Sequence, residues 1–232
     1  MHTKFKVLLL VRHGQSTGNV DQPTQDHASI PLTALGEEQA RKLSAHIDVR
    51  PDLIVTSSFR RAQQTAEPLC KRFPDVPVEV WPETAEFTYL SPERCRGTRR
   101  TERLPWVRAY WQRQEPDYCD GAGAESFHAL VARARLVLQR IEERPEETIV
   151  LFSHGQFISC LLDIARHPYA TDDERMAVFR SLPELDNTGS STCCCRSGTD
   201  RKAGIIYLKE IEQILIAKCF SFLYNEEKFK RQ

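Results

Sequence analysis

The sequence predicts an α/β fold, a three-layer α/β/α sandwich with a mainly parallel central sheet. Short apolar runs alternate with longer helical patterns over most of the chain, which is typical of parallel strands covered by helices. Several apolar runs lead directly into polar residues, at the strand ends where open α/β sheets bind ligands. Neither a linker nor an internal repeat interrupts the pattern, so we expect a single domain over residues 1–232.

The first part of the chain predicts strands at residues 5–11, 53–56 and 78–80. The helix expected over 33–47 has Thr33 as its N-cap, and Glu37 and Glu38 in its first turn suit the helix dipole. The helix expected over 58–73 begins on a serine cap at Ser58.

Residues 81–123 break this alternation. They contain several prolines, Trp106 and Trp111, and a basic run of five arginines: Arg94, Arg96, Arg99, Arg100 and Arg103. We expect an irregular or partly helical insertion over the sheet edge, and long excursions of this kind are often functional lids. The alternation then returns with a helix over 125–143, a strand over 148–152 and a helix over 156–166.

The tail from about residue 189 is harder to interpret. Residues 189–204 are rich in Ser, Thr, Cys and Gly; within them 192–196 could form a closing strand, followed by another at 204–208. Residues 205–224 are apolar with mixed periodicity, which fits a strand followed by a helix or two strands equally well. Residues 225–232 are charged and expected to fray.

Charge and composition bound the partners. The chain has 32 basic and 32 acidic side chains, so no global field favours nucleic acid or a membrane surface. No apolar run approaches the roughly 20 residues that span a bilayer, and a cytoplasmic protein is expected. The eight cysteines form no C-x-x-C pair, which favours reduced, structural thiols over metal or redox chemistry.

Polar residues at three strand ends carry the expected chemistry. Arg12 and His13 follow the first strand, Arg61 lies just beyond the second, and His154 follows the strand at 148–152. Parallel strands would bring these cations and imidazoles to one edge of the sheet, where helix N-termini add partial positive charge. Such a pocket can bind a phosphate dianion without a metal or another cofactor.

The chain resembles the histidine phosphatase superfamily, which includes cofactor-dependent phosphoglycerate mutases and fructose-2,6-bisphosphatases. The blocks that carry this resemblance follow the family's order over residues 5 to about 190. They are Arg12-His13-Gly14-Gln15-Ser16 with Asn19, Leu32-Thr33 with Gly36 and Gln39-Ala40, Ser57, Arg61-Ala62 with Gln64-Thr65-Ala66, and Ser153-His154-Gly155.

The resemblance implies a role for each matching residue. His13 matches the nucleophile that forms a phosphohistidine. Arg12, Arg61 and His154 match the residues that hold the phosphoryl oxygens, whereas Arg60 is expected to be a solvated neighbour. Ser16 and Asn19 match loop residues that touch the phosphoryl group or the substrate.

The resemblance also implies a carboxylic acid that protonates the leaving group and then activates water. Glu83 and Glu86 are both candidates, and Glu86 is favoured because Phe87 follows it and a short loop comes next. Either glutamate could instead simply face solvent.

The expected function is metal-independent hydrolysis of a small-molecule phosphomonoester, with the substrate and the oligomeric state left open. A phosphoglycerate mutase-like phosphoryl transfer is an alternative, although the mutases' Glu-Arg-His-Tyr-Gly stretch is absent at Glu86. A non-catalytic phospho-ligand binding or interaction module on the same fold is another. The basic run could form a second anion site or a solvated face with Glu93 and Glu102. Trp106, Tyr110 and Trp111 could wall the pocket, but core positions are favoured.

Overall fold

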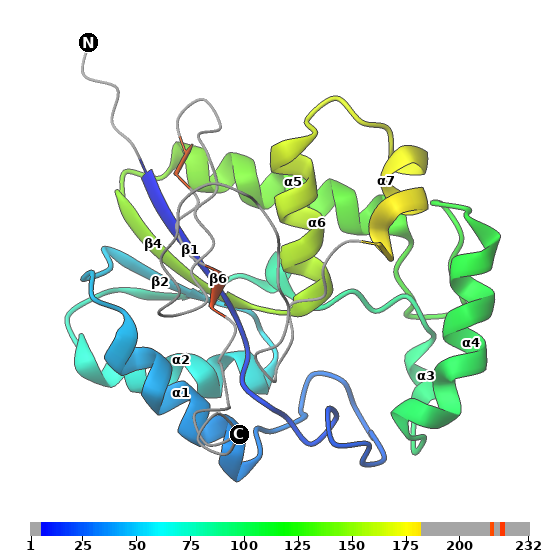
Figure 1. Cartoon of the computed structure of the whole chain (residues 1–232), viewed down its shortest axis with the longest axis horizontal. Coiled ribbons are helices and arrows are strands. Elements are labelled where there is room, and N and C mark those ends of the chain that lie inside the picture. Colours follow the sequence, from blue (N-terminus) through cyan, green and yellow to red (C-terminus); the bar gives the residue numbers. More distant parts are fainter. Residues whose placement is uncertain (1–5, 182–213, 216–218, 221–232) are drawn as a thin grey trace, which may run out of the picture.

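In the computed structural model, which describes residues 6–181, 214–215 and 219–220, a parallel sheet forms the centre of the molecule (Figure 1). Its strand order is β3-β2-β4-β1-β5, and β6 also pairs with β1. The strands are β1 (Lys6–Arg12), β2 (Leu53–Thr56), β3 (Val78–Val80), β4 (Thr148–Ser153), β5 (Ile214–Leu215) and β6 (Cys219–Phe220). Every pair is parallel, which confirms the α/β class.

Helices cover both faces of the sheet. The helices are α1 (Ala34–His46), α2 (Arg60–Arg72), α3 (Pro92–Cys95), α4 (Arg100–Arg113), α5 (Phe127–Glu143), α6 (Gly155–Arg166) and α7 (Asp172–Phe179), with a 3-10 turn η1 at Pro82–Thr84. Helices α1 and α2 pack together on one face, and α5 and α6 on the other (Figure 1).

Strand β1 shows why two cores form. Leu8 and Leu10 belong to the cluster that contains α5 and α6, whereas Leu9 and Val11 belong to the cluster under α1 and α2. Alternate residues of a strand point to opposite faces, so a continuous apolar run is what a strand covered on both faces requires.

Several expected boundaries are confirmed. Strands β2 and β3 match the expected ranges, and the Thr33 hydroxyl caps α1 by accepting from the Gly36 N–H at 3.1 Å. Ser58 is not the cap of α2, however, because that helix begins at Arg60 and its N-cap position is Phe59. The Ser57 hydroxyl accepts from the Phe59 N–H at 3.2 Å in the turn before the helix, so α2 begins later than expected.

The 81–123 insertion is partly helical, as expected, and contains α3 and α4. Val78 and Val80 on the edge strand β3 stay about half exposed, so the insertion does not cover that edge. Its α4 helix instead packs over the helical layer, where Trp111 stacks on Phe179 of α7 with ring centroids 5.4 Å apart. Helix α7 was not expected from the sequence.

The aromatic residues of the insertion are mostly core. Tyr110 and Trp111 are buried, and Trp106 packs against the same cluster. The guanidinium of Arg94 lies 4.2 Å from the Trp106 ring centroid, and its charge pairs with Asp120 rather than with Glu93.

Most predictions for the tail fall outside the described residues, including the strands expected at 192–196 and 204–208. Only β5 and β6 are described there, within the apolar stretch 205–224. Among the described residues, no helix is long and apolar enough to cross a membrane. Cys70, Cys95, Cys119 and Cys160 are free thiols.

Candidate active site

The parallel register brings three strand ends to one place. Arg12 at the end of β1 pairs with Ser153 at the end of β4, and Thr56 of β2 pairs with Phe152 of β4. The backbone continues this alignment beyond the strands, since the His13 N–H donates to the Ser153 carbonyl at 3.0 Å. The residues that follow each strand therefore meet at the carboxyl edge of the sheet, as the sequence predicted.

His13 is buried and held through both ring nitrogens. The residue is only 5% exposed. The Arg61 Nε–H donates to His13 Nε2 at 3.0 Å, so that nitrogen carries the lone pair. The proton then belongs on Nδ1, which lies 2.7 Å from the Gly14 carbonyl oxygen. This hydrogen-bond network leaves Nε2 as the nucleophilic nitrogen of a neutral imidazole.

The electrostatic surroundings keep His13 neutral. Burial lowers its pKa well below the usual value for histidine, and the charges of Arg61 and Arg12 lower the pKa further. His154 has its pKa lowered well below the usual value for the same reasons, burial first and then the charge of Arg61. Both imidazoles are therefore unprotonated near neutral pH, and the unprotonated form is the nucleophilic form of an imidazole.

Arg61 is fixed by three neighbours. Besides His13, its guanidinium donates from Nη1 to the His27 carbonyl at 2.7 Å and lies 4.9 Å from the Phe59 ring centroid. Burial lowers its pKa to about 10, so it stays charged at neutral pH. Its neighbour Arg60 is exposed, as expected of a solvated side chain.

His154 lies against His13, with ring centroids 5.2 Å apart. It is fully buried, its Nε2 lies 2.8 Å from the Ser57 hydroxyl, and its ring meets the edge of Phe59. Within the described part of the chain its Nδ1 has no hydrogen-bond partner. A buried nitrogen of this kind needs a partner, and a phosphoryl oxygen would supply one.

Glycines allow the elements around His13 to approach closely. A Cβ on Gly14 would lie 2.6 Å from the Gly36 carbonyl oxygen, and a Cβ on Gly36 would lie 2.0 Å from that of Gln15. Neither position can accept a larger residue without backbone movement. At the start of α6, Gly155 lets the Arg12 guanidinium lie flat against it, since a Cβ there would be 3.3 Å from Arg12 Nε.

The loop after His13 is held by side chains from α1 and α2. The Gln15 N–H donates to Gln39 Oε1 at 2.8 Å, and the Leu32 N–H donates to Gln64 Oε1 at 2.9 Å. Within the loop, the backbone N–H and the hydroxyl of Ser16 both donate to Asn19 Oδ1, at 2.9 and 2.8 Å. The glutamines of the sequence motifs therefore shape the loop rather than the pocket.

Glu86 lines a cavity beside Arg12, whereas Glu83 does not. The Glu86 carboxylate accepts the Phe87 N–H at 2.9 Å and, at the N-terminus of α6, the Phe157 N–H at 3.1 Å. Glu83 instead lies 3.8 Å from Arg140, whose guanidinium is over Trp81. This placement supports Glu86 over Glu83 as the acid.

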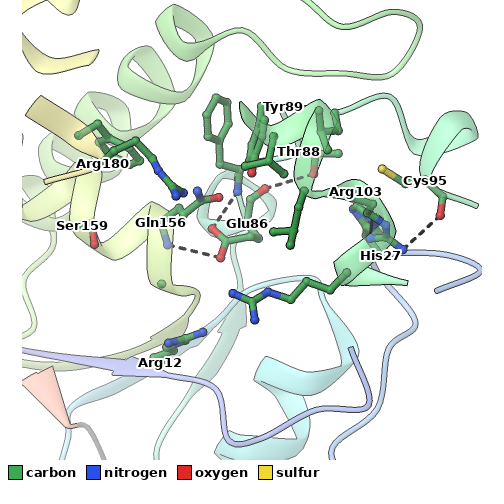
Figure 2. A pocket seen from close by; sticks show the side chains of 17 residues that line it. Arg12, His27, Glu86, Thr88, Tyr89, Cys95, Arg103, Gln156, Ser159 and Arg180 are labelled. Carbon is green, nitrogen blue, oxygen red and sulfur yellow. Dashed lines mark hydrogen bonds between the residues drawn. The ribbon is translucent and has the colours of Figure 1, made fainter. Parts of the chain in front are cut away.

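The cavity measures about 310 Å³ and is markedly cationic. Its charged lining consists of Arg12, Arg100, Arg103 and Arg180 against the single acid Glu86. Figure 2 shows Glu86 in the middle, with Arg103 and His27 on one flank and Arg180 on the other. Apolar side chains, among them Leu104 and Val107 of α4, complete the wall.

Sequence reasoning missed part of this lining. His27, Gln156 and Arg180 belong to it but lie in no motif. Arg180 follows α7, whose start carries a signal that could have been used: Thr171 and Glu174 form a capping box. Groups of three or more residues that could hold a metal ion are not found in the described part of the chain.

Comparisons with known proteins agree with this geometry. The chain is 32% identical over 161 residues to the adenosylcobalamin/alpha-ribazole phosphatase of Escherichia coli, covering 67% of this chain and 76% of that protein. It is 30% identical over 155 residues to the uncharacterized phosphatase PhoE of Bacillus subtilis, covering 66% of this chain and 74% of that protein. The crystal structure of the alpha-ribazole phosphatase from Shigella flexneri is similar, with a TM-score of 0.59, 29% identity and coverage of 73% and 82%.

The family model for branch 1 of the histidine phosphatase superfamily matches residues 8–185. That range contains all three strand ends at which Arg12, His13, Arg61 and His154 meet. The chain therefore belongs to the histidine phosphatase superfamily.

Proposed function

We propose that this chain hydrolyses small-molecule phosphomonoesters through a phosphohistidine intermediate on His13, without a metal ion. The observation that carries the proposal is the buried contact between Arg61 Nε and His13 Nε2 at 3.0 Å. It fixes a nucleophilic nitrogen beside a guanidinium, the group best shaped to hold phosphoryl oxygens. Relatives named as phosphatases support hydrolysis in particular.

In the first step His13 Nε2 attacks phosphorus while the bond to the ester oxygen breaks on the opposite side. The entering phosphoryl group takes over the Arg61 donors, which releases the Nε2 lone pair. Arg12, Arg61 and His154 hold the three equatorial oxygens and stabilise the charge that spreads over them. The Ser16 hydroxyl donates to Asn19 Oδ1, which leaves the side-chain NH₂ of Asn19 to donate to the substrate.

Protonated Glu86 gives its proton to the departing alkoxide, which leaves as the alcohol. In the second step the Glu86 carboxylate takes a proton from water, and the resulting oxygen attacks phosphorus. The N–P bond breaks, and inorganic phosphate and neutral His13 are regenerated.

We further propose that the chain is a single domain and works in the cytoplasm. The family match and the sheet both extend over most of the chain, which supports one folding unit. The free thiols of the described cysteines fit a reducing compartment.

The test is phosphate release from a panel of phosphomonoesters in EDTA, comparing wild type with His13→Ala. Release by wild type alone, with acid-labile phosphate trapped on the protein, is expected. Loss of activity in EDTA would contradict the metal-free mechanism. Phosphoryl transfer between positions of a phosphoglycerate without release would support the mutase alternative, and ester binding without turnover would support a binding module.

A further inference from the structure

One face of α4 supplies a second cationic wall to the cavity. Arg100, Arg103, Leu104 and Val107 all line it, at the i, i+3, i+4 and i+7 spacing that places side chains on one side of a helix. The two arginines come first along the face and the two aliphatic residues follow. Arg12 and Glu86 of the proposed phosphoryl site line the same cavity.

Arg103 is held in place by neutral acceptors. Its Nε donates to the Thr98 hydroxyl at 2.8 Å, and its Nη2 donates to the carbonyls of Cys95 and Thr98 at 3.1 and 2.6 Å. These contacts fix the orientation of the guanidinium. Because none of these acceptors is a carboxylate, its positive charge is retained rather than neutralised.

The remaining contact of Arg103 reaches His27. Arg103 Nη1 lies 3.3 Å from His27 Nε2. Burial first, and then the charge of Arg103, lower the pKa of His27 to about 4, so at neutral pH the imidazole accepts rather than repels the guanidinium. One Nη1 hydrogen of Arg103 is left over after these contacts, and Arg103 is among the residues that line the cavity.

Glu93 and Glu102 do not neutralise this wall. Glu102 accepts the Arg99 backbone N–H at 2.6 Å, and neither glutamate lines the cavity. Arg94, from the same basic run, faces away and pairs with Asp120. Thus Arg100 and Arg103 form the cavity part of the run, and the other three arginines do not line the cavity.

We propose that Arg103, assisted by Arg100, binds a second anionic group of the substrate, a carboxylate or a second phosphate, at the far end from the scissile phosphoryl group. The proposal rests on the proposed phosphatase activity and narrows its substrate to small bis-anionic phosphomonoesters. Leu104 and Val107 pack against the apolar spacer between the two anions. A cavity of about 310 Å³ fits a small metabolite.

The experiment measures kcat/KM for ω-phosphooxyalkanoic acids with increasing numbers of methylenes, each paired with its methyl ester. The ester keeps the shape and removes the charge. A parallel arm compares alkanediol bisphosphates with the corresponding monophosphates, which distinguishes a carboxylate from a phosphate as the second anion. We expect at least one chain length at which the charged member is preferred by about 10- to 100-fold, the range for a charge-assisted hydrogen bond.

Variants assign this preference to α4. Arg103→Gln should reduce the preference for the charged substrate over its methyl ester to about twofold or less, while turnover of the methyl esters is kept. Arg108→Gln, an equal charge change at an exposed position of the same helix, should leave it unchanged. Arg100→Gln should reduce it in part, and serves in place of Arg103→Gln if loss of the Thr98 and Cys95 contacts prevents folding.

The outcomes separate the two proposals. Equal turnover of acids and esters at every length would overturn the second anion site and leave the phosphatase intact. Loss of the preference in Arg180→Gln but not in the α4 variants would also overturn the assignment. If neither series is hydrolysed, the phosphatase proposal fails, and calorimetric binding of each pair to His13→Ala still decides whether the anion is recognised.

Discussion

The two ends of the cavity are built in different ways. At the phosphoryl end, His13, Arg61 and His154 are buried and lie directly after parallel strands or in the first turn of a helix. At the far end, Arg103 comes from α4 and is fixed by backbone carbonyls, whereas His27 comes from a loop and its own backbone carbonyl accepts from Arg61. The first arrangement follows from sheet topology and suits any phosphoryl group. The second depends on one irregular segment, so it is the part that can select a substrate.

Replacing the nucleophile should have the largest effect and should abolish chemistry at the strand ends. His13→Ala is expected to lower kcat by on the order of 10⁴ or more, since removal of a covalent nucleophile leaves only residual rate. His46→Ala, at an exposed histidine on α1, is the matched control and should keep full activity. If His13→Ala keeps more than a few per cent of wild-type kcat, His13 is not the nucleophile.

The buried arginine comes next. Arg61→Lys keeps the charge but loses the planar fork and the Nε contact with His13, so kcat should fall by roughly 10² to 10³. Arg60→Lys makes the same change one residue earlier, at an exposed side chain, and should change kcat less than twofold. Similar losses in both variants would mean that Arg61 acts through helix stability rather than through the phosphoryl group.

Glu86 lies between the two ends and its effect should depend on the leaving group. Glu86→Gln is expected to lower kcat/KM for alkyl phosphates by about 10² or more, because an alkoxide needs the proton. Aryl phosphates with acidic phenols should be much less affected. The matched control is Glu83→Gln, which changes a residue outside the cavity; if it shows the leaving-group signature instead, the acid assignment moves to Glu83.

The sequence predicted the strand ends well because local signals and topology agree there. A continuous apolar run such as β1 identifies a strand covered on both faces, and parallel pairing then places His13 beside His154. At the far end the signal was weaker, because the basic run that contains Arg100 and Arg103 fitted a second anion site and a solvated face equally well. The contact between Arg103 and His27 joins residues far apart in the chain, and neither residue type nor spacing indicates it.

The same reasoning explains the error at the start of α2 and the position in which the insertion packs. Ser57 and Ser58 are equally good cap candidates by residue type. The Ser57 hydroxyl, however, lies 2.8 Å from His154 Nε2 and accepts from the Phe59 N–H, and α2 begins only at Arg60. The insertion leaves the edge strand β3 uncovered, and its aromatic residue Trp111 packs on Phe127 and Phe179. Tertiary burial of large rings decided that position, and burial partners are not encoded in local pattern.

Replacing Arg133, which lies beside the backbone that carries Glu86, should have a smaller effect on kcat. Arg133 of α5 donates to the carbonyls of Glu83 and Ala85 at 2.6 and 2.8 Å, and to the Glu125 carboxylate at 2.9 Å. It therefore fixes the backbone that carries Glu86. Arg133→Lys should lower kcat for alkyl phosphates by about tenfold, through misplacement of the acid, with little effect on aryl phosphates.

The control for this support is Arg135→Lys, two residues along the same helix at an exposed position. It should behave as wild type on both substrate classes. An equal loss on alkyl and aryl phosphates in Arg133→Lys would show a general structural defect rather than a role in positioning Glu86.

The smallest effect concerns pH and stability at the far end. The pKa of His27 is lowered by burial to about 4, below the value of about 6.5 for an unfolded histidine. Between these values the unfolded chain binds a proton that the folded chain does not, so the free energy of unfolding falls as pH falls from 6.5 toward 4. The limiting slope is about 1.4 kcal/mol per pH unit for each such histidine.

His13 and His154 add to this dependence, since their pKa values are lowered as well. Urea unfolding at a series of pH values should therefore show a steeper slope for wild type than for His27→Gln, by up to one proton. His46→Gln should match wild type, because that histidine is exposed in the folded chain. An unchanged slope in His27→Gln would mean that folding does not lower the pKa of His27, and that below about pH 6.5 its imidazole is protonated beside Arg103 instead of accepting from it.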